Sequence, residues 1–172
     1  HQDGHSHILS STIPNCLSYD PTFSYEIAAI IKDGIQKMYV ENKNYFYYIT
    51  TMNENYEQPE MPEGSEEGII KGLYKFKSCN NPQVRLVGSG SILRESIKAA
   101  KLLQNYGIDS EVWSATSFNL LRKEGMEVER ENQLNPTLEQ KTSYVSECFN
   151  DSDIPIIATT DYMRSYAEQI RP

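Results

Sequence analysis

The stretch Val84-Arg85-Leu86-Val87-Gly88-Ser89-Gly90-Ser91 decides the fold class, because it reads as a strand that turns directly into a helix. Apolar residues at helical spacing follow it, and Gly107 stands where a helix is expected to stop. Residues 109–114 and 154–159 have the composition of two further strands. This alternation with short connections predicts an α/β fold, with a parallel or mostly parallel sheet and helices on both faces.

Further helices are predicted between and after these strands. Ser117 can cap a short helix that holds Phe118, Leu120 and Leu121, and a polar stretch from Lys123 to Lys141 separates it from a helix at residues 144–149. Asp161 is expected to cap the last helix, which continues to Ile170.

The N-terminal third follows a different pattern. Asp20, a good N-cap residue, and Pro21, at the first helical position, precede apolar residues at steps of three and four, which predicts a helix of about 18 residues. The aromatic and β-branched residues 45–52 predict a buried strand. Residues 53–65 are rich in Asn, Glu, Pro and Gly, as linkers are. We therefore expect residues 1–56 to form the last part of a first domain, residues 57–82 to form a linker, and residues 83–172 to form the first part of a second domain.

Composition excludes several classes of protein. The chain has 172 residues, 38% of them hydrophobic, and a net charge of −8 with scattered cations, which argues against nucleic-acid binding. No apolar run reaches the roughly 20 residues of a membrane span, and no secretory signal is visible. Cys16, Cys79 and Cys148 are too few and too dispersed for a disulfide framework or a zinc knuckle. A cytoplasmic protein is expected, and the start at a histidine suggests a piece of a longer one.

All three histidines, His1, His5 and His7, lie in the first seven residues. Imidazole titrates nearest to neutral pH, so the cluster is a candidate for proton transfer or metal binding. Histidine-rich ends are often purification tags, but the mixture with Asp3 and Gly4 favours a functional loop. A catalytic imidazole needs a neighbour that fixes its tautomer, and either Asp3 or a group outside the chain could provide it.

Two other features are candidate ligand-binding positions. The turn at residues 88–91 could cradle a phosphate, but it lacks the third glycine of a dinucleotide fingerprint and the Gly-Lys-Ser/Thr of a P-loop, so a tight structural turn is favoured. Asp161 follows a strand at a position where ligands often bind, although a capping role is favoured. No metal site is predicted.

Several motifs resemble one known family, the homodimeric bacterial pyruvate dehydrogenase E1 component, almost from end to end. The matching motifs are His1-Gln2-Asp3-Gly4-His5-Ser6-His7-Ile8, Thr12-Ile13-Pro14-Asn15-Cys16, Tyr48-Ile49-Thr50-Thr51-Met52-Asn53-Glu54-Asn55-Tyr56, Met61-Pro62-Glu63-Gly64, Gly88-Ser89-Gly90-Ser91-Ile92-Leu93-Arg94 and Thr160-Asp161-Tyr162-Met163.

The resemblance implies an oxidoreductase of glycolysis and pyruvate metabolism. Such an enzyme decarboxylates pyruvate on thiamine diphosphate with magnesium and passes the acetyl unit to the lipoyl group of the E2 acetyltransferase. It also implies that residues 1–56 end a pyrimidine-binding α/β domain and that residues 83–172 begin a transketolase-like C-terminal domain. The family's magnesium and diphosphate motif and its activating glutamate have no match here. The cofactor is therefore expected to bind mainly outside this segment, and the segment alone is expected to be inactive.

The resemblance also assigns roles to the histidines. The family's active-site histidine falls on His1, which would orient the pyruvate carboxylate or stabilise the charge that develops on the thiamine adduct. A substrate-contacting histidine of transketolases falls on His7, whereas His5 has the least support. Two alternatives remain open: a dimerisation or interaction module of a thiamine-dependent enzyme, and a transketolase-like relative with another acceptor.

Overall fold

The structure, a computed structural model, describes residues 3–149 and 153–171. Its larger sheet has the strand order β3-β5-β4-β6, built from β3 (Tyr74–Lys77), β4 (Val84–Gly88), β5 (Ser110–Ser114) and β6 (Ile156–Thr159). Strand β4 pairs in parallel with β5 and β6, whereas β3 is antiparallel to β5. The predicted mostly parallel sheet is confirmed.

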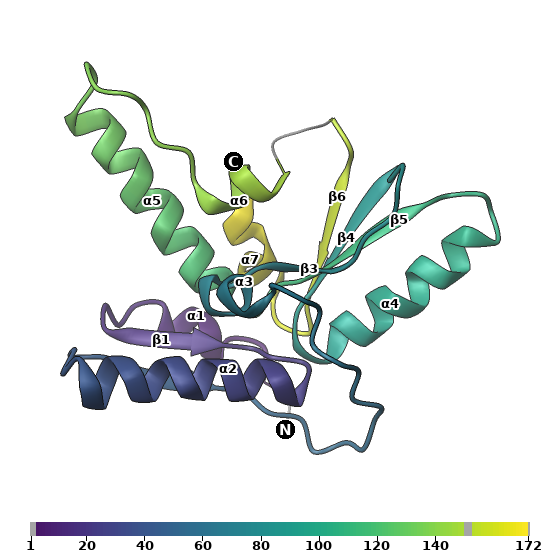
Figure 1. Cartoon of the computed structure of the whole chain (residues 1–172), viewed down its shortest axis with the longest axis horizontal. Helices are drawn as coiled ribbons and strands as arrows, with labels where there is room; N and C mark the ends of the chain where they lie inside the picture. Colours follow the sequence, from purple (N-terminus) through teal and green to yellow (C-terminus); the bar gives the residue numbers. More distant parts are fainter. Residues whose placement is uncertain (1–2, 150–152, 172) are drawn as a thin grey trace.

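Helices cover both faces of this sheet (Figure 1). On one face lies α4 (Gly90–Gln104), where Leu93 packs against Leu86 of β4. On the other lie α5 (Phe118–Leu134), α6 (Tyr144–Phe149), α7 (Arg164–Ala167) and the 3-10 turn η2 (Glu168–Ile170), with Phe118 and Tyr166 against Val87. Leu86 and Val87 point to opposite faces because side chains alternate along a strand.

A second, smaller sheet pairs β1 (Cys16–Tyr19) in parallel with β2 (Phe46–Ile49). Against it packs α2 (Ser24–Ile35), which continues as a π-helical turn, η1 (Gln36–Val40), and α3 (Glu66–Lys71) joins the same core. Leu17, Tyr19, Ile30 and Ile69 form the centre of this core and are almost fully buried.

Glu26 connects the two sheets through α2. Its carboxylate is fully buried and accepts hydrogen bonds from the backbone N–H groups of Thr22 and Phe23, from Tyr74 of β3 at 2.6 Å and from Ser114 of β5 at 2.7 Å. Burial raises the pKa of this carboxyl, and the four hydrogen bonds act in the opposite direction. A buried acceptor with four donors fixes where α2 begins relative to the larger sheet.

Several local expectations differ from the structure. Asp20 does not cap α2, which begins three residues beyond Pro21, and Asp161 does not cap α7, where Met163 holds that position. The predicted short helix at Ser117 instead extends to Leu134, with its polar residues on the solvent side. Strand β2 is half-exposed rather than buried, since Phe46 keeps 42% of its surface in solvent.

Residues 66–77, inside the range expected as a linker, form α3 and β3. Their sequence is polar on one side only, and β3 is held by its pairing with β5. Among the residues that the structure describes, no helix combines the length and the apolar character that a membrane crossing requires.

Candidate functional site

The carboxyl ends of parallel strands from both sheets meet in one place. Asp20 follows β1, Thr50 follows β2, Ser89 follows β4 and Thr160 follows β6, and we call these four residues the junction. Two backbone hydrogen bonds hold it together, from Asp20 N to Thr116 O at 2.7 Å and from Gly90 N to Asp20 O at 3.0 Å. Ligand sites in open α/β folds lie beyond the carboxyl ends of strands, so the junction is the natural candidate site.

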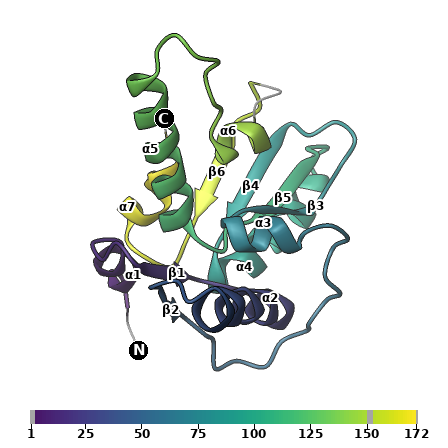
Figure 2. The ribbon, with the colours of Figure 1, turned by 60° about the vertical axis from the view of Figure 1, so that its left-hand side comes forward.

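The histidine segment lies against this junction. Residues 6–10 form the short helix α1 (Ser6–Ser10), which lies beside β1 and α7 (Figure 2). A loop was expected here, but Asp3 accepts hydrogen bonds from the backbone N–H groups of His5 and Ser6 and so starts a helical turn. The Ser6 hydroxyl also donates to Asp3. His5 is exposed, and His1 lies outside the described residues.

His7 is enclosed by aromatic rings. The Tyr166 ring stacks on it with centroids 5.0 Å apart, and the rings of Tyr162 and Tyr48 approach edge-on at 4.8 and 5.3 Å. No part of His7 is exposed to solvent. This burial lowers the pKa of His7 to about 4, although the nearby Asp3 carboxylate acts to raise it. His7 is therefore neutral at physiological pH.

One ring nitrogen of His7 reaches the junction. Its Nε2 atom lies 3.2 Å from Thr50 Oγ1, which in turn lies 2.7 Å from Asp20 Oδ1. Within the described residues, His7 Nδ1 and Asp20 Oδ2 are buried and have no hydrogen-bond partner. Burial raises the pKa of Asp20 to about 6, the Thr50 hydroxyl lowers it, and the Glu26 and Asp161 carboxylates raise it further.

The glycine turn between β4 and α4 receives the Asp20 carboxylate. Gly90 has φ +49°, and a Cβ atom there would lie 2.6 Å from the carboxyl carbon of Asp20. The negative group therefore occupies the N-terminal end of α4, where helix N–H groups favour an anion. This placement supports the structural interpretation of the turn over a phosphate site.

Two groups from the helical side of the larger sheet, one backbone N–H and one side chain, also bind the histidine segment. Met163 N donates to Gly4 O at 2.9 Å, and Asn119 Nδ2 donates to His7 O at 2.7 Å and to Ser18 Oγ at 2.6 Å. The segment is thus held on one side by helices of the larger sheet and on the other, through Thr50, by the smaller one.

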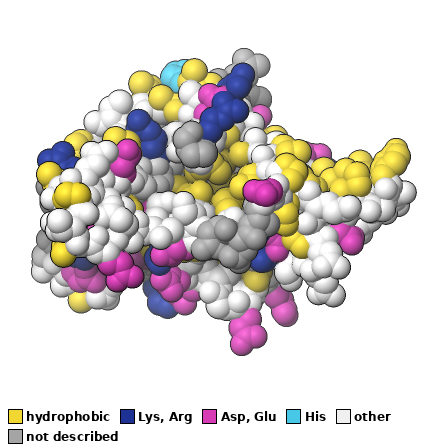
Figure 3. Space-filling view, turned by 90° about the horizontal axis from the view of Figure 1, so that it is seen from above, with side chains coloured by type: hydrophobic (Ala, Val, Ile, Leu, Met, Phe, Trp, Pro, Cys, Tyr) yellow, Lys and Arg dark blue, Asp and Glu magenta, His cyan; other side chains and the backbone are white. Residues whose placement is uncertain are grey.

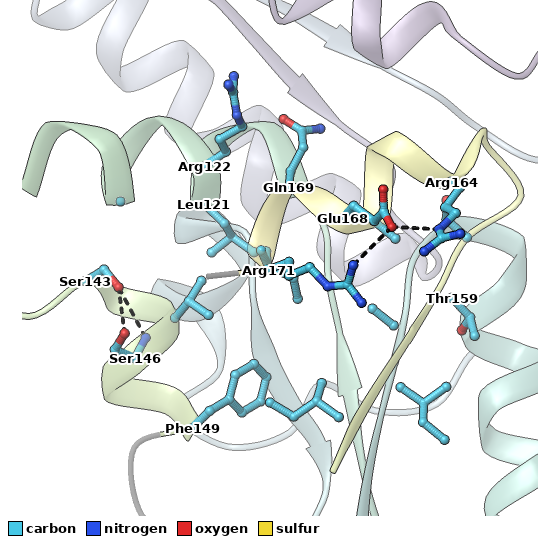
Figure 4. A pocket seen from close by; sticks show the side chains of 18 of the residues that line it. Leu121, Arg122, Ser143, Ser146, Phe149, Thr159, Arg164, Glu168, Gln169 and Arg171 are labelled. Atoms are coloured by element: carbon cyan, nitrogen blue, oxygen red, sulfur yellow. Dashed lines mark hydrogen bonds and ion pairs between the residues drawn. The ribbon is translucent and has the colours of Figure 1, made fainter. Parts of the chain in front are cut away.

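A hollow lies between α5, α6, β6 and α7, and its lining includes Tyr162, which also packs against His7, and Thr160 of the junction. Figure 3 shows hydrophobic side chains gathered in a hollow of this face. In Figure 4, Glu168 lies between Arg164 and Arg171, at 2.6 and 3.6 Å from their guanidinium groups. The two arginine side chains are largely exposed to solvent, and that of Glu168 is partly exposed.

No group of three His, Cys, Asp or Glu side chains that could hold a metal ion occurs within residues 3–149 and 153–171. Together with the occupied turn at Gly90, this means that the described residues do not fit a magnesium–diphosphate group.

Sequence reasoning missed the two side chains that link His7 to the junction. Asp20 was read as a helix cap, and Thr50 as part of a strand. The rule that ligands lie beyond strand ends did not single out Thr50, because the predicted strand continued to residue 52, whereas β2 ends at Ile49. It could not single out Asp20, because β1 was not predicted.

Comparison with known proteins identifies the family. The family model of the pyruvate dehydrogenase E1 component middle domain matches residues 1–59, and that of the transketolase-like TK C-terminal domain matches residues 72–172. The pyruvate dehydrogenase E1 component of Pseudomonas aeruginosa is 57% identical over 99% of this chain. The chain belongs to the pyruvate dehydrogenase E1 component family.

Other members and folds agree with this assignment. The E1 component of Escherichia coli K12 is 51% identical over 99% of the chain. The chain spans about a fifth (20%) of the length of both relatives. The transketolase of Leishmania mexicana shares the fold with a TM-score of 0.64 and 17% identity, over 95% of this chain and 21% of that one.

Proposed function

We propose that this chain forms part of a pyruvate dehydrogenase E1 component that decarboxylates pyruvate and transfers the acetyl unit to the lipoyl group of an E2 acetyltransferase. The identity of 57% over nearly the whole chain carries this proposal. The enzyme would act as a homodimer in the cytoplasm, within glycolysis and pyruvate metabolism. The division into a pyrimidine-binding part over 1–56, a linker over 57–82 and a C-terminal part over 83–172 belongs to the same proposal.

Thiamine diphosphate with Mg²⁺ would supply the site that accepts the two-carbon unit. Because the described residues do not fit these groups, we assign their binding mainly to residues outside this segment. The contribution of this chain is the histidine segment, which the junction holds in place.

Within that segment we assign substrate contact to His1. An imidazole can hydrogen-bond a carboxylate and stabilise charge that develops during decarboxylation. His7 was expected to contact substrate as well, and that role stays a prediction. Its ring is fully enclosed by Tyr48, Tyr162 and Tyr166, so contact would require these rings to move.

Replacement of His1 in the intact protein tests the proposal. His1→Ala should lower the turnover of pyruvate by about 10²–10⁴, the usual effect of removing a positioned acid–base group. His5→Ala is the matched control, because it removes an exposed imidazole from the same segment. Acetyl transfer to a lipoyl domain, measured with thiamine diphosphate and Mg²⁺ present, is the assay. Unchanged turnover in His1→Ala would exclude His1, and absence of pyruvate-dependent transfer in the wild type would exclude the function.

A further inference from the structure

The acceptors near the Thr50 hydroxyl show which of its hydrogen bonds it donates and which it accepts. A hydroxyl group has one hydrogen to donate. Thr50 Oγ1 lies 2.7 Å from Asp20 Oδ1 and 3.3 Å from Tyr19 O, so its hydrogen goes to the nearer, charged acceptor. The oxygen then accepts from His7 Nε2 at 3.2 Å. The hydrogen of the neutral imidazole is therefore on Nε2.

The surroundings of His7 oppose the other tautomer. In the described structure Nδ1 is buried and faces no hydrogen-bond acceptor, so a hydrogen there would be an unpaired buried donor. Such a group typically costs about 1–3 kcal/mol. The stacked Tyr166 and the edge-on Tyr162 also restrict rotation of the ring.

The side chain of His7 makes a hydrogen bond to a residue that ends a strand of the smaller sheet, in addition to the packing of α1 beside β1 and of Tyr48 against the ring. The other anchors of the segment, Met163 and Asn119, come from the region of the larger sheet. Loss of the Thr50 bond would remove the hydrogen bond that ties the His7 ring to the junction, whereas the packing of α1 beside β1 and α7 would remain. The His7 ring, and the part of the segment that carries it, would then be less closely fixed beside the junction.

We infer that Thr50 and Asp20 are positioning residues for the histidine segment. The relay from His7 Nε2–H to Thr50 and from Thr50 to Asp20 selects one tautomer of His7 and fixes its ring, and with it the described part of the histidine segment, beside the junction. This inference rests on the proposed function, because the position of the segment matters for catalysis only if the segment contributes to substrate contact.

Three variants of the intact protein isolate the relay. Thr50→Val removes the hydroxyl at nearly constant volume, and Thr50→Ser restores it. Thr116→Val is the control, since it removes the hydroxyl of a nearby, fully buried threonine that donates to Ile69 O instead. If Thr50→Val does not fold, as judged by circular dichroism, Thr50→Ala is measured in its place.

The first measurement is the tautomer of His7, from imidazole nitrogen-15 chemical shifts assigned with a His7→Gln variant. We expect the Nε2–H form in the wild type, in Thr50→Ser and in Thr116→Val, and a mixture of both tautomers in Thr50→Val. An unchanged tautomer in Thr50→Val would overturn the inference, whatever the activity.

The second measurement is steady-state kinetics with pyruvate. A segment displaced by about 1 Å can lose roughly 10²-fold in rate, so kcat of Thr50→Val should fall by about 10–100-fold, with recovery in Thr50→Ser. The KM should change less than kcat. A changed tautomer with unchanged kcat would also overturn the positioning role. If the wild type does not act on pyruvate, the proposed function fails, and the nitrogen-15 shifts alone decide whether the relay exists.

Discussion

His7 and Asp20 titrate over nearly the same pH range with opposite effects on stability. His7 has its pKa lowered to about 4 from 6.5, so stability is lost as pH falls through this window, because only the unfolded chain binds the proton. Asp20 has its pKa raised to about 6 from 3.8, so the folded chain binds the proton first and stability is gained as pH falls. Each shift corresponds to about 3 kcal/mol, and the two largely cancel.

The substitution Asp20→Asn should reveal this compensation. Asparagine keeps an oxygen that can accept from Thr50 but does not titrate. As pH falls from 7 to 4, the variant should therefore lose about 3 kcal/mol more of its free energy of unfolding than the wild type does. Urea unfolding of both proteins at several pH values measures this difference. The other carboxylates contribute equally to the pH dependence of both proteins, so their contribution cancels. Parallel pH profiles for the two proteins would show that Asp20 has an ordinary pKa.

Gly90 should be intolerant of a side chain because of Asp20. Gly90→Ala combines a positive φ, which costs about 1–2 kcal/mol for an L-residue, with a Cβ atom too close to the Asp20 carboxyl group. We expect Gly90→Ala to lower the free energy of unfolding by about 3–4 kcal/mol in total. The part of this loss that comes from the clash should disappear when Asp20 is also replaced by Ala.

Gly107→Ala is the control for this experiment. Gly107 also has a positive φ, +72°, but an added Cβ atom would meet nothing within 4 Å. Its replacement should therefore show the backbone cost alone, and its effect should add to that of Asp20→Ala without coupling. An equal cost for both glycines would mean that Asp20 exerts no steric constraint on the turn.

At the scale of elements, Glu26 determines how α2 meets the larger sheet. Glu26→Ala would leave the hydroxyls of Tyr74 and Ser114 and two backbone N–H groups without their acceptor. Removal of one partner from such a buried network should lower the free energy of unfolding by about 3–5 kcal/mol. The matched control is Glu66→Ala, which breaks an exposed ion pair with Lys32 and should cost less than about 1 kcal/mol. Similar losses in denaturant unfolding would contradict a structural role for Glu26.

The elements that were predicted correctly from the sequence are those whose bounds are marked by residues within or next to the element itself. Gly107 marks the end of α4, and the hydroxyl of Ser117 accepts from Leu120 N and caps α5 as expected. Strands β1 (Cys-Leu-Ser-Tyr) and β3 (Tyr-Lys-Phe-Lys) lack the apolar run that made β2 and β6, of the same length, recognisable, and they are held by pairing with strands elsewhere in the chain. The full length of α5 was not predicted, because its outer half is polar on nearly every side.

At the scale of the whole molecule, the candidate site combines parts that are far apart in the sequence. The three rings that enclose His7 come from distant segments of the chain, from Tyr48, Tyr162 and Tyr166. The sequence around His7 therefore did not predict that this histidine is buried. The motif resemblance indicated which segment matters. The bonds that hold the segment depend on how the two sheets meet, which the sequence pattern left open.

The outer face of α2 supports the proposed homodimer. Ile31, Ile35, Tyr39 and Val40 keep 47%, 54%, 75% and 62% of their surfaces exposed in the described structure. Ile31, Ile35 and Tyr39 follow one another at steps of four, so they form one apolar stripe along the helix and its π-helical extension. Such a stripe is typical of a surface that is covered by further protein, either the other four-fifths of a polypeptide as long as its relatives or a second subunit, and we propose the second subunit.

Replacement of Ile35 by lysine tests this interface in the intact protein. A charge in the middle of the stripe would have to be buried on association, so Ile35→Lys should shift the protein from dimer toward monomer in sedimentation velocity. Because Ile35 is already half-exposed, thermal stability of the monomer should change little. Leu102→Lys on α4 is the matched control, with 62% of its surface exposed but no place in the stripe. If both variants sediment as the wild type does, the α2 stripe is not the contact between subunits.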